Sequence, residues 1–244
     1  MSAARRSRAP GGDVGLERLR RPKAVFIDVG GPLYTDENFL VAAITALDEL
    51  RAEGGDGPVD RAAARALYDA FRNGREPSLR GALAERFLGS AARRGELHER
   101  TRAHWQHPAG TLYPDALPFL AAVSRHATIG VLANQEAGVI DALRRDGAGD
   151  LVSVWGVSAV VGHEKPSPEL FAWCLDQAGA RADEAVHIGN RFDNDVAPAH
   201  ALGFGTVWVL RGEAPDEAPP AQAAVADLVV PDLAGLADVL FPAE

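Results

Sequence analysis

Polar residues follow four of the short apolar runs in this 244-residue chain. They are Asp28; Asn134 and Gln135; Lys165; and Asn190, Asp193 and Asp195. Carboxylates and amines are the side chains that nucleophilic and acid–base catalysis use, and carboxylates also bind hard cations. Brought together, these residues would combine a carboxylate, a cation and an acidic cluster in one place.

Each group also has an ordinary structural explanation. Asp28 alone is compatible with a turn cap, Lys165 with a surface loop before a helix, and residues 190–195 with an Asx-turn followed by a helix cap. Taken one at a time, these explanations are favoured. Taken together, they leave the arrangement of four polar groups at four strand ends to chance.

Alternating strand and helix patterns would position the four groups. Residues 24–28 form an apolar run without alternation, typical of a strand buried on both faces, and a turn signal follows at residues 30–32. Further strand-like runs lie at 128–133, 152–161, 185–189, 206–210 and 228–231, and helical patterns after Asp115 and at about 137–146, 168–178, 195–202 and 233–241. This alternation predicts an α/β fold with a Rossmann-like parallel sheet and helices on both faces. Ligands bind beyond the carboxyl ends of such strands, which is where all four groups are expected.

Residues 36–110 follow a different pattern, with helical spacing in consecutive segments that Gly and Pro residues separate. They predict an all-helical cap domain inserted after the first strand. The expected domains are therefore a core of residues 23–35 and 111–244 and a cap of residues 36–110. Residues 1–22, rich in Arg, Gly and Pro, are predicted to be a disordered tail.

The overall charge limits the partners of the chain. A net charge of −9 disfavours nucleic acid and anionic membranes, and no apolar stretch is long enough to span a bilayer. The single cysteine, Cys174, excludes a disulfide framework, so we expect a cytoplasmic protein. A small anionic substrate would need a local positive pocket.

Three motifs resemble those of the haloacid dehalogenase-like (HAD) superfamily of hydrolases and phosphatases. Residues 26–33 read FIDVGGPL, residues 164–171 read EKPSPELF, and residues 187–195 read HIGNRFDND. The resemblance extends from about residue 24 to residue 240, and the inserted helices are similar to the cap of that family.

The resemblance implies roles for individual residues. Asp28 would be the nucleophile and form an aspartyl ester that water hydrolyses, and Lys165 would keep Asp28 ionised and neutralise charge on the transferred group. The expected substrate-binding residues are Gly30, Gly31, Asn134 and Gln135. The expected Mg²⁺ ligands are Asp28, Gly30, Asn190 and Asp195, with Asp193 as a substitute ligand or water-activating base.

The chain departs from the family pattern at three positions. Gly30 replaces the aspartate that protonates the leaving group, a loss that typically costs about 10²- to 10⁴-fold in rate for a poor leaving group. Ala133 replaces a hydroxyl donor, and Asn190 replaces an acidic metal ligand, which weakens Mg²⁺ binding. Tyr34, Asp36 or Glu37 is a candidate to replace the lost acid, whereas His187 is interpreted as a histidine with an internal partner inside its strand.

These features leave alternative functions open. The first is a HAD-type hydrolase, of phosphatase type, that acts on a small phosphorylated metabolite and uses Mg²⁺ weakly. The second is a metal-independent, dehalogenase-like hydrolase that acts at carbon. The spacing of Asn190 and Asp193 favours it, although the arginine expected early in a dehalogenase cap is missing between Gly31 and Leu50. The third is a catalytically degenerate binding protein.

Overall fold

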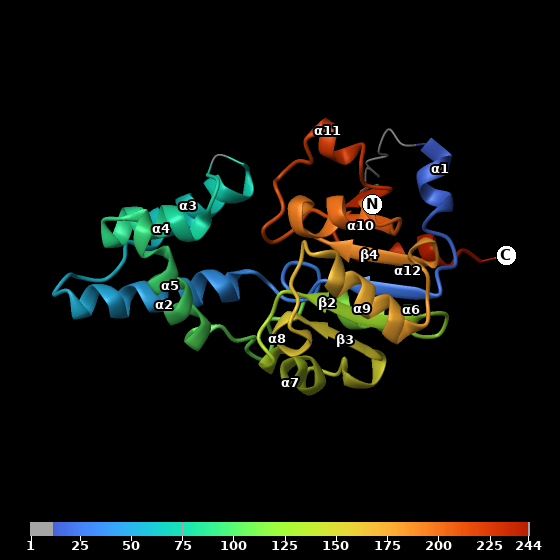
Figure 1. Ribbon diagram of the computed structural model, residues 1–244, viewed down its shortest axis with the longest axis horizontal. Coiled ribbons are helices and arrows are strands. Elements are labelled where there is room, and N and C mark those ends of the chain that lie inside the picture. Colours follow the sequence, from blue (N-terminus) through green and yellow to red (C-terminus); the bar gives the residue numbers. More distant parts are fainter. Residues whose placement is uncertain (1–11, 75, 244) are drawn as a thin grey trace, which may run out of the picture. The chain divides into compact units, whose positions relative to one another are not determined.

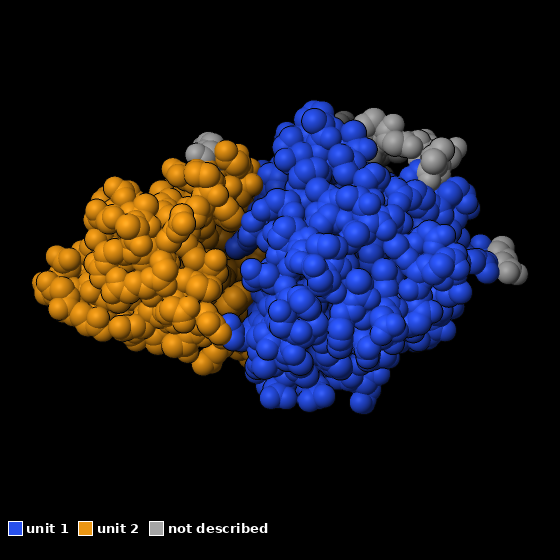
Figure 2. Space-filling view, viewed as in Figure 1, with its two compact units in different colours: residues 1–35, 112–244 blue, residues 36–111 orange. Residues whose placement is uncertain are grey.

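The computed structural model describes residues 12–74 and 76–243 (Figure 1). They fall into two compact units (Figure 2). One contains the described residues up to Thr35 and those from Leu112 onward, and the other contains the described residues from Asp36 to Thr111. Within the described ranges, no helix has the length and apolar character needed to cross a membrane.

The first unit is built on a six-stranded parallel sheet with the strand order β3-β2-β1-β4-β5-β6. Its strands are β1 (Ala24–Ile27), β2 (Thr128–Ala133), β3 (Val154–Val157), β4 (Ala185–Gly189), β5 (Gly205–Val209) and β6 (Leu228–Val230). The central strand β1 pairs with β2 on one side and with β4 on the other. The residues that follow these three strands therefore meet at one edge of the sheet, and the predicted Rossmann-like α/β fold is confirmed.

Helices cover both faces of this sheet because successive side chains of each strand point to opposite faces. The helices of this unit are α1 (Gly12–Glu17), α6 (Ala116–Val123), α7 (Gly138–Arg145), α8 (Ser158–Val161), α9 (Pro168–Ala178), α10 (Ala197–Ala201), α11 (Pro220–Ala223) and α12 (Leu236–Leu240). Val25 and Ile27 belong to a core with residues from α6, α7 and α12, whereas Ala24 and Phe26 belong to a core with residues from α9 and α10.

The second unit is helical and has its own core. It contains α2 (Glu37–Glu53), α3 (Arg61–Arg72), α4 (Leu79–Leu88) and α5 (Arg94–His104). Asp60 caps α3 by accepting hydrogen bonds from the amides of Ala62 and Ala63, and Ser78 caps α4 by accepting one from Gly81. Apolar residues from all four helices form a single cluster.

The amino-terminal segment differs from the expected disordered tail. Residues 1–11 of that tail lie outside the described residues. From Gly12 onward the prediction was wrong, because α1 forms and Leu19 is fully buried in the core of the sheet. Arg18 donates to the carbonyls of Gly203 and Phe204 at 3.3 and 2.9 Å. Buried leucine and satisfied backbone carbonyls offset the entropy of ordering this segment.

Two further expectations are corrected. The strand predicted over residues 152–161 ends at Val157, because Ser158–Val161 turns into α8 and Gly162 closes that turn at a φ of 83°. Asp115 does not cap α6 with its side chain. It accepts hydrogen bonds from Arg211 and from the amide of Leu233 instead.

Candidate active site

Asp28 follows the last residue of β1 at the carboxyl edge of the sheet. Its amide donates to the carbonyl of Ile188 at 2.9 Å, which ties the residue to β4. Its side chain is 13% exposed, so the carboxylate reaches solvent, and Oδ1 lies 3.0 Å from Nζ of Lys165. Burial raises the pKa of Asp28 above its ordinary value, and the Asp195 charge adds to the rise while Lys165 opposes it.

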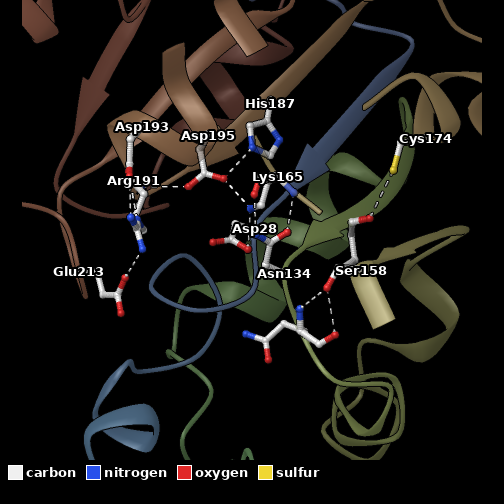
Figure 3. Close-up of polar contacts among 12 residues, drawn as sticks. Asp28, Asn134, Ser158, Lys165, Cys174, His187, Arg191, Asp193, Asp195 and Glu213 are labelled. Atoms are coloured by element: carbon white, nitrogen blue, oxygen red, sulfur yellow. Dashed lines mark hydrogen bonds and ion pairs between the residues drawn. The ribbon is translucent and has the colours of Figure 1, made fainter. Parts of the chain in front are cut away.

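Lys165 connects two carboxylates (Figure 3). Its Nζ lies 2.5 Å from Oδ1 of Asp195 and 3.0 Å from Oδ1 of Asp28, and its side chain is almost completely buried. Burial by itself lowers the pKa of Lys165, but the charges of Asp195 and Asp28 outweigh that effect and raise the pKa. Lys165 is therefore held as a cation next to the one carboxylate of the pair that solvent reaches.

Asp195 is fully buried and satisfied by donors from three residues. Oδ1 faces Lys165 and Nε2 of His187, the latter at 3.1 Å, and Oδ2 accepts from the amide of Arg191 at 3.0 Å. Burial alone raises the pKa of Asp195, but Lys165 and His187 hold it well below its ordinary range. Gly189 makes the close approach possible, because a Cβ there would lie 2.3 Å from the Asp195 side chain.

His187 extends this row of contacts, and its part in the site was missed in the sequence. His187 was interpreted as a strand histidine with an internal partner. The structure shows that this partner is Asp195, which itself contacts Lys165. Among the described residues, the buried Nδ1 of His187 has no hydrogen-bond partner, and Phe171 packs edge-on against the ring at 5.5 Å. The available signal was a polar residue in an otherwise apolar strand, eight positions before an aspartate.

Asn134 and Gln135, predicted to bind substrate, follow the buried strand end at Ala133. The Asn134 side chain holds the backbone of Lys165: Nδ2 donates to its carbonyl at 2.8 Å, and Oδ1 accepts from its amide at 2.7 Å. The amide of Gln135 donates to Oγ of Ser158 at 3.1 Å, and its side chain is buried. The Asn134 amide group therefore positions the lysine.

Gly30 and Gly31 form the turn after Asp28, and Gly31 needs to be glycine. It has a φ of 87°, and a Cβ there would lie 2.1 Å from Nδ2 of Asn190. Asn190 is buried, and its Nδ2 donates to the carbonyl of Arg211 at 3.1 Å. The Asn190 side chain thus packs against the turn.

The structure does not bring every predicted residue to Asp28. Asp193 is exposed, and both of its carboxylate oxygens accept from the guanidinium of Arg191, which also pairs with Glu213 (Figure 3). Tyr34, a candidate replacement acid, is buried and donates its hydroxyl to Asp146 at 2.6 Å. Neither contact involves Asp28.

Two of the four predicted magnesium ligands, Asp195 and Asn190, contact other groups of the protein. Both oxygens of Asp195 accept hydrogen bonds from protein donors, and the Asn190 side chain packs against the turn. Nowhere in residues 12–74 and 76–243 do three or more His, Cys, Asp or Glu side chains form a group that could hold a metal ion. The Asp28 carboxylate and the Gly30 carbonyl would hold Mg²⁺ only with water or substrate phosphate to complete its coordination, as is usual for this ion.

Known proteins resemble this chain over most of its length. A family model described as haloacid dehalogenase-like hydrolase matches residues 22–203. The phosphoglycolate phosphatase of Rhodospirillum rubrum is 29% identical over 232 residues, which cover 91% of this chain and 92% of that protein. The phosphoserine phosphatase of Thermus thermophilus is 37% identical over 111 residues, or 43% of each chain. This chain spans less than half of the length of several curated relatives that it matches.

Solved structures agree on the fold. A crystal structure of a HAD phosphatase from Thermococcus onnurineus superposes with a TM-score of 0.60 at 23% identity, covering 89% of this chain and 97% of that one. The resemblance inferred from the three sequence motifs is confirmed. Because the family match extends from the residues before β1 to the turn after α10, this protein belongs to the haloacid dehalogenase-like hydrolase family.

Proposed function

We propose that the protein is a phosphatase-type hydrolase that acts on a small phosphorylated metabolite, with Asp28 as the nucleophile. The observation that carries this proposal is the 3.0 Å contact between Oδ1 of Asp28 and Nζ of Lys165 at the carboxyl edge of the sheet. The similarity to a phosphoglycolate phosphatase over nearly the whole of both chains supports the choice of phosphorus as the electrophile.

The reaction has two steps. An Asp28 carboxylate oxygen attacks phosphorus, the new O–P bond forms an aspartyl phosphate, and the bond to the leaving oxygen breaks with its electron pair. Water then attacks phosphorus, the Asp28–P bond breaks, and inorganic phosphate and the Asp28 carboxylate are released. Lys165 contributes a fixed positive charge beside the reacting oxygen in both steps.

Gly30 limits the substrates that suit this site. A family aspartate at this position would give a proton to the leaving oxygen, and Gly30 has no side chain to do so. The leaving group must therefore take its proton from water or depart as a stable anion. We infer that acyl and aryl phosphates, which release stable anions, react faster than simple alkyl phosphates.

A substrate panel tests the proposed function. Parent protein and Asp28→Asn are assayed with aryl, acyl and alkyl phosphates, with Mg²⁺ and with chelator. We expect phosphate release by the parent, a loss of at least about 10³-fold in Asp28→Asn, and no change in Asp141→Asn, whose side chain is 85% exposed. A panel without any Asp28-dependent product would overturn the proposal and favour a binding protein.

Hydrolytic displacement at carbon is a second candidate. It is favoured by one observation, namely that Asp195 and Asn190, two predicted metal ligands, are engaged by other groups of the protein. The same Asp28 and Lys165 pair would then displace halide, which needs no proton to leave. Halide release from 2-haloacids in chelator, lost in Asp28→Asn, would select this candidate over the phosphatase.

A further inference from the structure

We propose that Arg211 is a positioning residue that fixes the turn after Asp28, and through it the geometry of the nucleophile. The inference rests on the proposed function for its catalytic consequence. Arg211 follows β5 and is not adjacent in sequence to any of the three motifs. Its side chain nevertheless reaches the first of them.

The guanidinium of Arg211 holds two successive carbonyls of the turn. Nε donates to the carbonyl of Gly31 at 2.9 Å, and Nη2 donates to the carbonyl of Pro32. The turn also has backbone hydrogen bonds of its own, from the amide of Gly31 to Tyr34 and from the amides of Leu33 and Tyr34 to Val29. Arg211 adds side-chain donors to the carbonyls of Gly31 and Pro32, so its removal takes a charged hydrogen bond away from each of them.

The guanidinium is itself held in place from the opposite side. Nη1 lies 3.0 and 2.9 Å from the two oxygens of Asp115, and the ring of Tyr113 lies 4.0 Å from the guanidinium carbon. Asp115 also accepts from the amide of Leu233 at 2.8 Å. The planar guanidinium is bonded to a carboxylate on one side and to two carbonyls on the other, so it has little conformational freedom. It therefore restrains the turn.

The backbone of Arg211 reaches a second part of the site. Its carbonyl accepts from Nδ2 of Asn190, whose side chain packs against Gly31. Arg211 therefore has two contacts with the site. Its side chain bonds the turn that follows Asp28, and its main-chain carbonyl bonds the Asn190 side chain. No lysine could make the same contacts, because a single ammonium group lacks the fork that bonds two carbonyls and a carboxylate at once.

The expected catalytic effect follows from the distance dependence of nucleophilic attack. Asp28 is three residues before Gly31, so a turn that moves changes where the carboxylate points without changing its chemical nature. A displacement of about 1 Å in reacting groups can cost about 100-fold in rate. We expect Arg211→Met to lower kcat by roughly 10- to 100-fold and to change KM by less than about threefold, with Arg211→Lys between the two.

Hydrogen exchange tests the positioning without relying on activity. The full-length parent, Arg211→Met and Arg211→Lys are compared by mass spectrometry of the peptide that contains residues 29–35. We expect its amides to exchange at least about tenfold faster in Arg211→Met, while the peptide that contains β4 stays protected. Arg181→Met is the matched control, because that arginine is 69% exposed and its ion pairs within the described residues are with the nearby Asp183 and Glu184.

The two measurements have separate meanings. Unchanged exchange of residues 29–35 in both Arg211 variants would overturn the proposal, whether or not the parent turns over any substrate. Faster exchange with a parent-like kcat in an active enzyme would overturn its catalytic part. Failure of the proposed function shows in a different way, as a parent without Asp28-dependent product whose turn still loosens when Arg211 is replaced.

Discussion

Nζ of Lys165 lies 2.5 Å from Oδ1 of Asp195, closer than its 3.0 Å distance to Asp28. Lys165 and Asp195 thus form the closer, buried pair, and Asp28 is the carboxylate that solvent reaches. A buried charge that loses its partner is strongly destabilised, because the remaining charge stays away from water. The contacts of Lys165 and Asp195 predict how the protein responds to substitution.

Lys165→Met leaves Asp28 and Asp195 without their shared cation. We expect the free energy of unfolding to fall by about 3 kcal/mol, because the fully buried Asp195 carboxylate then lacks its cation. Asp28-dependent turnover should disappear as well. Urea denaturation measures the first effect, and an assay with the best substrate of the panel measures the second. A double variant with Asp195→Asn should recover part of the stability and none of the activity. Full activity in Lys165→Met would rule out the role given to this amine.

His187→Leu removes the Nε2 donor from the buried Asp195 carboxylate. We expect it to lower the free energy of unfolding by about 1–3 kcal/mol, the usual penalty of an unmet buried hydrogen bond. His187→Gln offers an amide donor at a similar reach and should be the more stable variant. Chemical denaturation of the two proteins side by side measures the difference. Equal stabilities would mean that the contact with Asp195 contributes nothing.

Magnesium alone is expected to leave the folded parent unchanged. Because a ligand stabilises a protein only when it binds the folded state, the melting temperature should agree within about 1 °C between millimolar Mg²⁺ and chelator. Asn190→Asp adds a carboxylate beside the turn and should show a larger rise with Mg²⁺. Asn194→Asp is the control, since it adds the same charge in the same loop. A clear rise in the melting temperature of the parent with Mg²⁺ would show instead that the folded protein binds the ion without substrate.

Cys174 gives a pH-dependent prediction. It is fully buried, and burial raises the pKa of its thiol to about 12, against roughly 8.5 in an unfolded chain. The unfolded chain loses the proton first, so stability is constant below about pH 8 and falls as the pH rises toward 12. Between pH 8 and pH 10, we expect the stability advantage of the parent over Cys174→Ala to shrink by about 1–2 kcal/mol. An advantage that stays the same would show that the thiol titrates alike in both states.

The sequence predicted the sheet well because its signals are local. Apolar runs mark the strands, and helical spacing marks the segments between them. The strand beginning at Val154 ended early because a contact outside the segment, between Ser158 and Gln135, favours the turn into α8. The ordered segment at Leu19 was missed for a similar reason. Its partners, Gly203 and Phe204, lie far along the chain and are bonded by the neighbouring Arg18.

By itself, the sequence determined that Asp28, Lys165 and Asp195 come to the carboxyl edge of one sheet. In parallel α/β folds, strands that are far apart in sequence can be neighbours in the sheet, so their carboxyl ends lie side by side. Only the tertiary structure decided what each polar group bonds to. Hydrogen bonds and charge pairs act over a few ångströms, so the use of Asn134 to hold Lys165, the engagement of Asp195 by His187 and the reach of Arg211 to Gly31 depend on side-chain positions that no local pattern encodes.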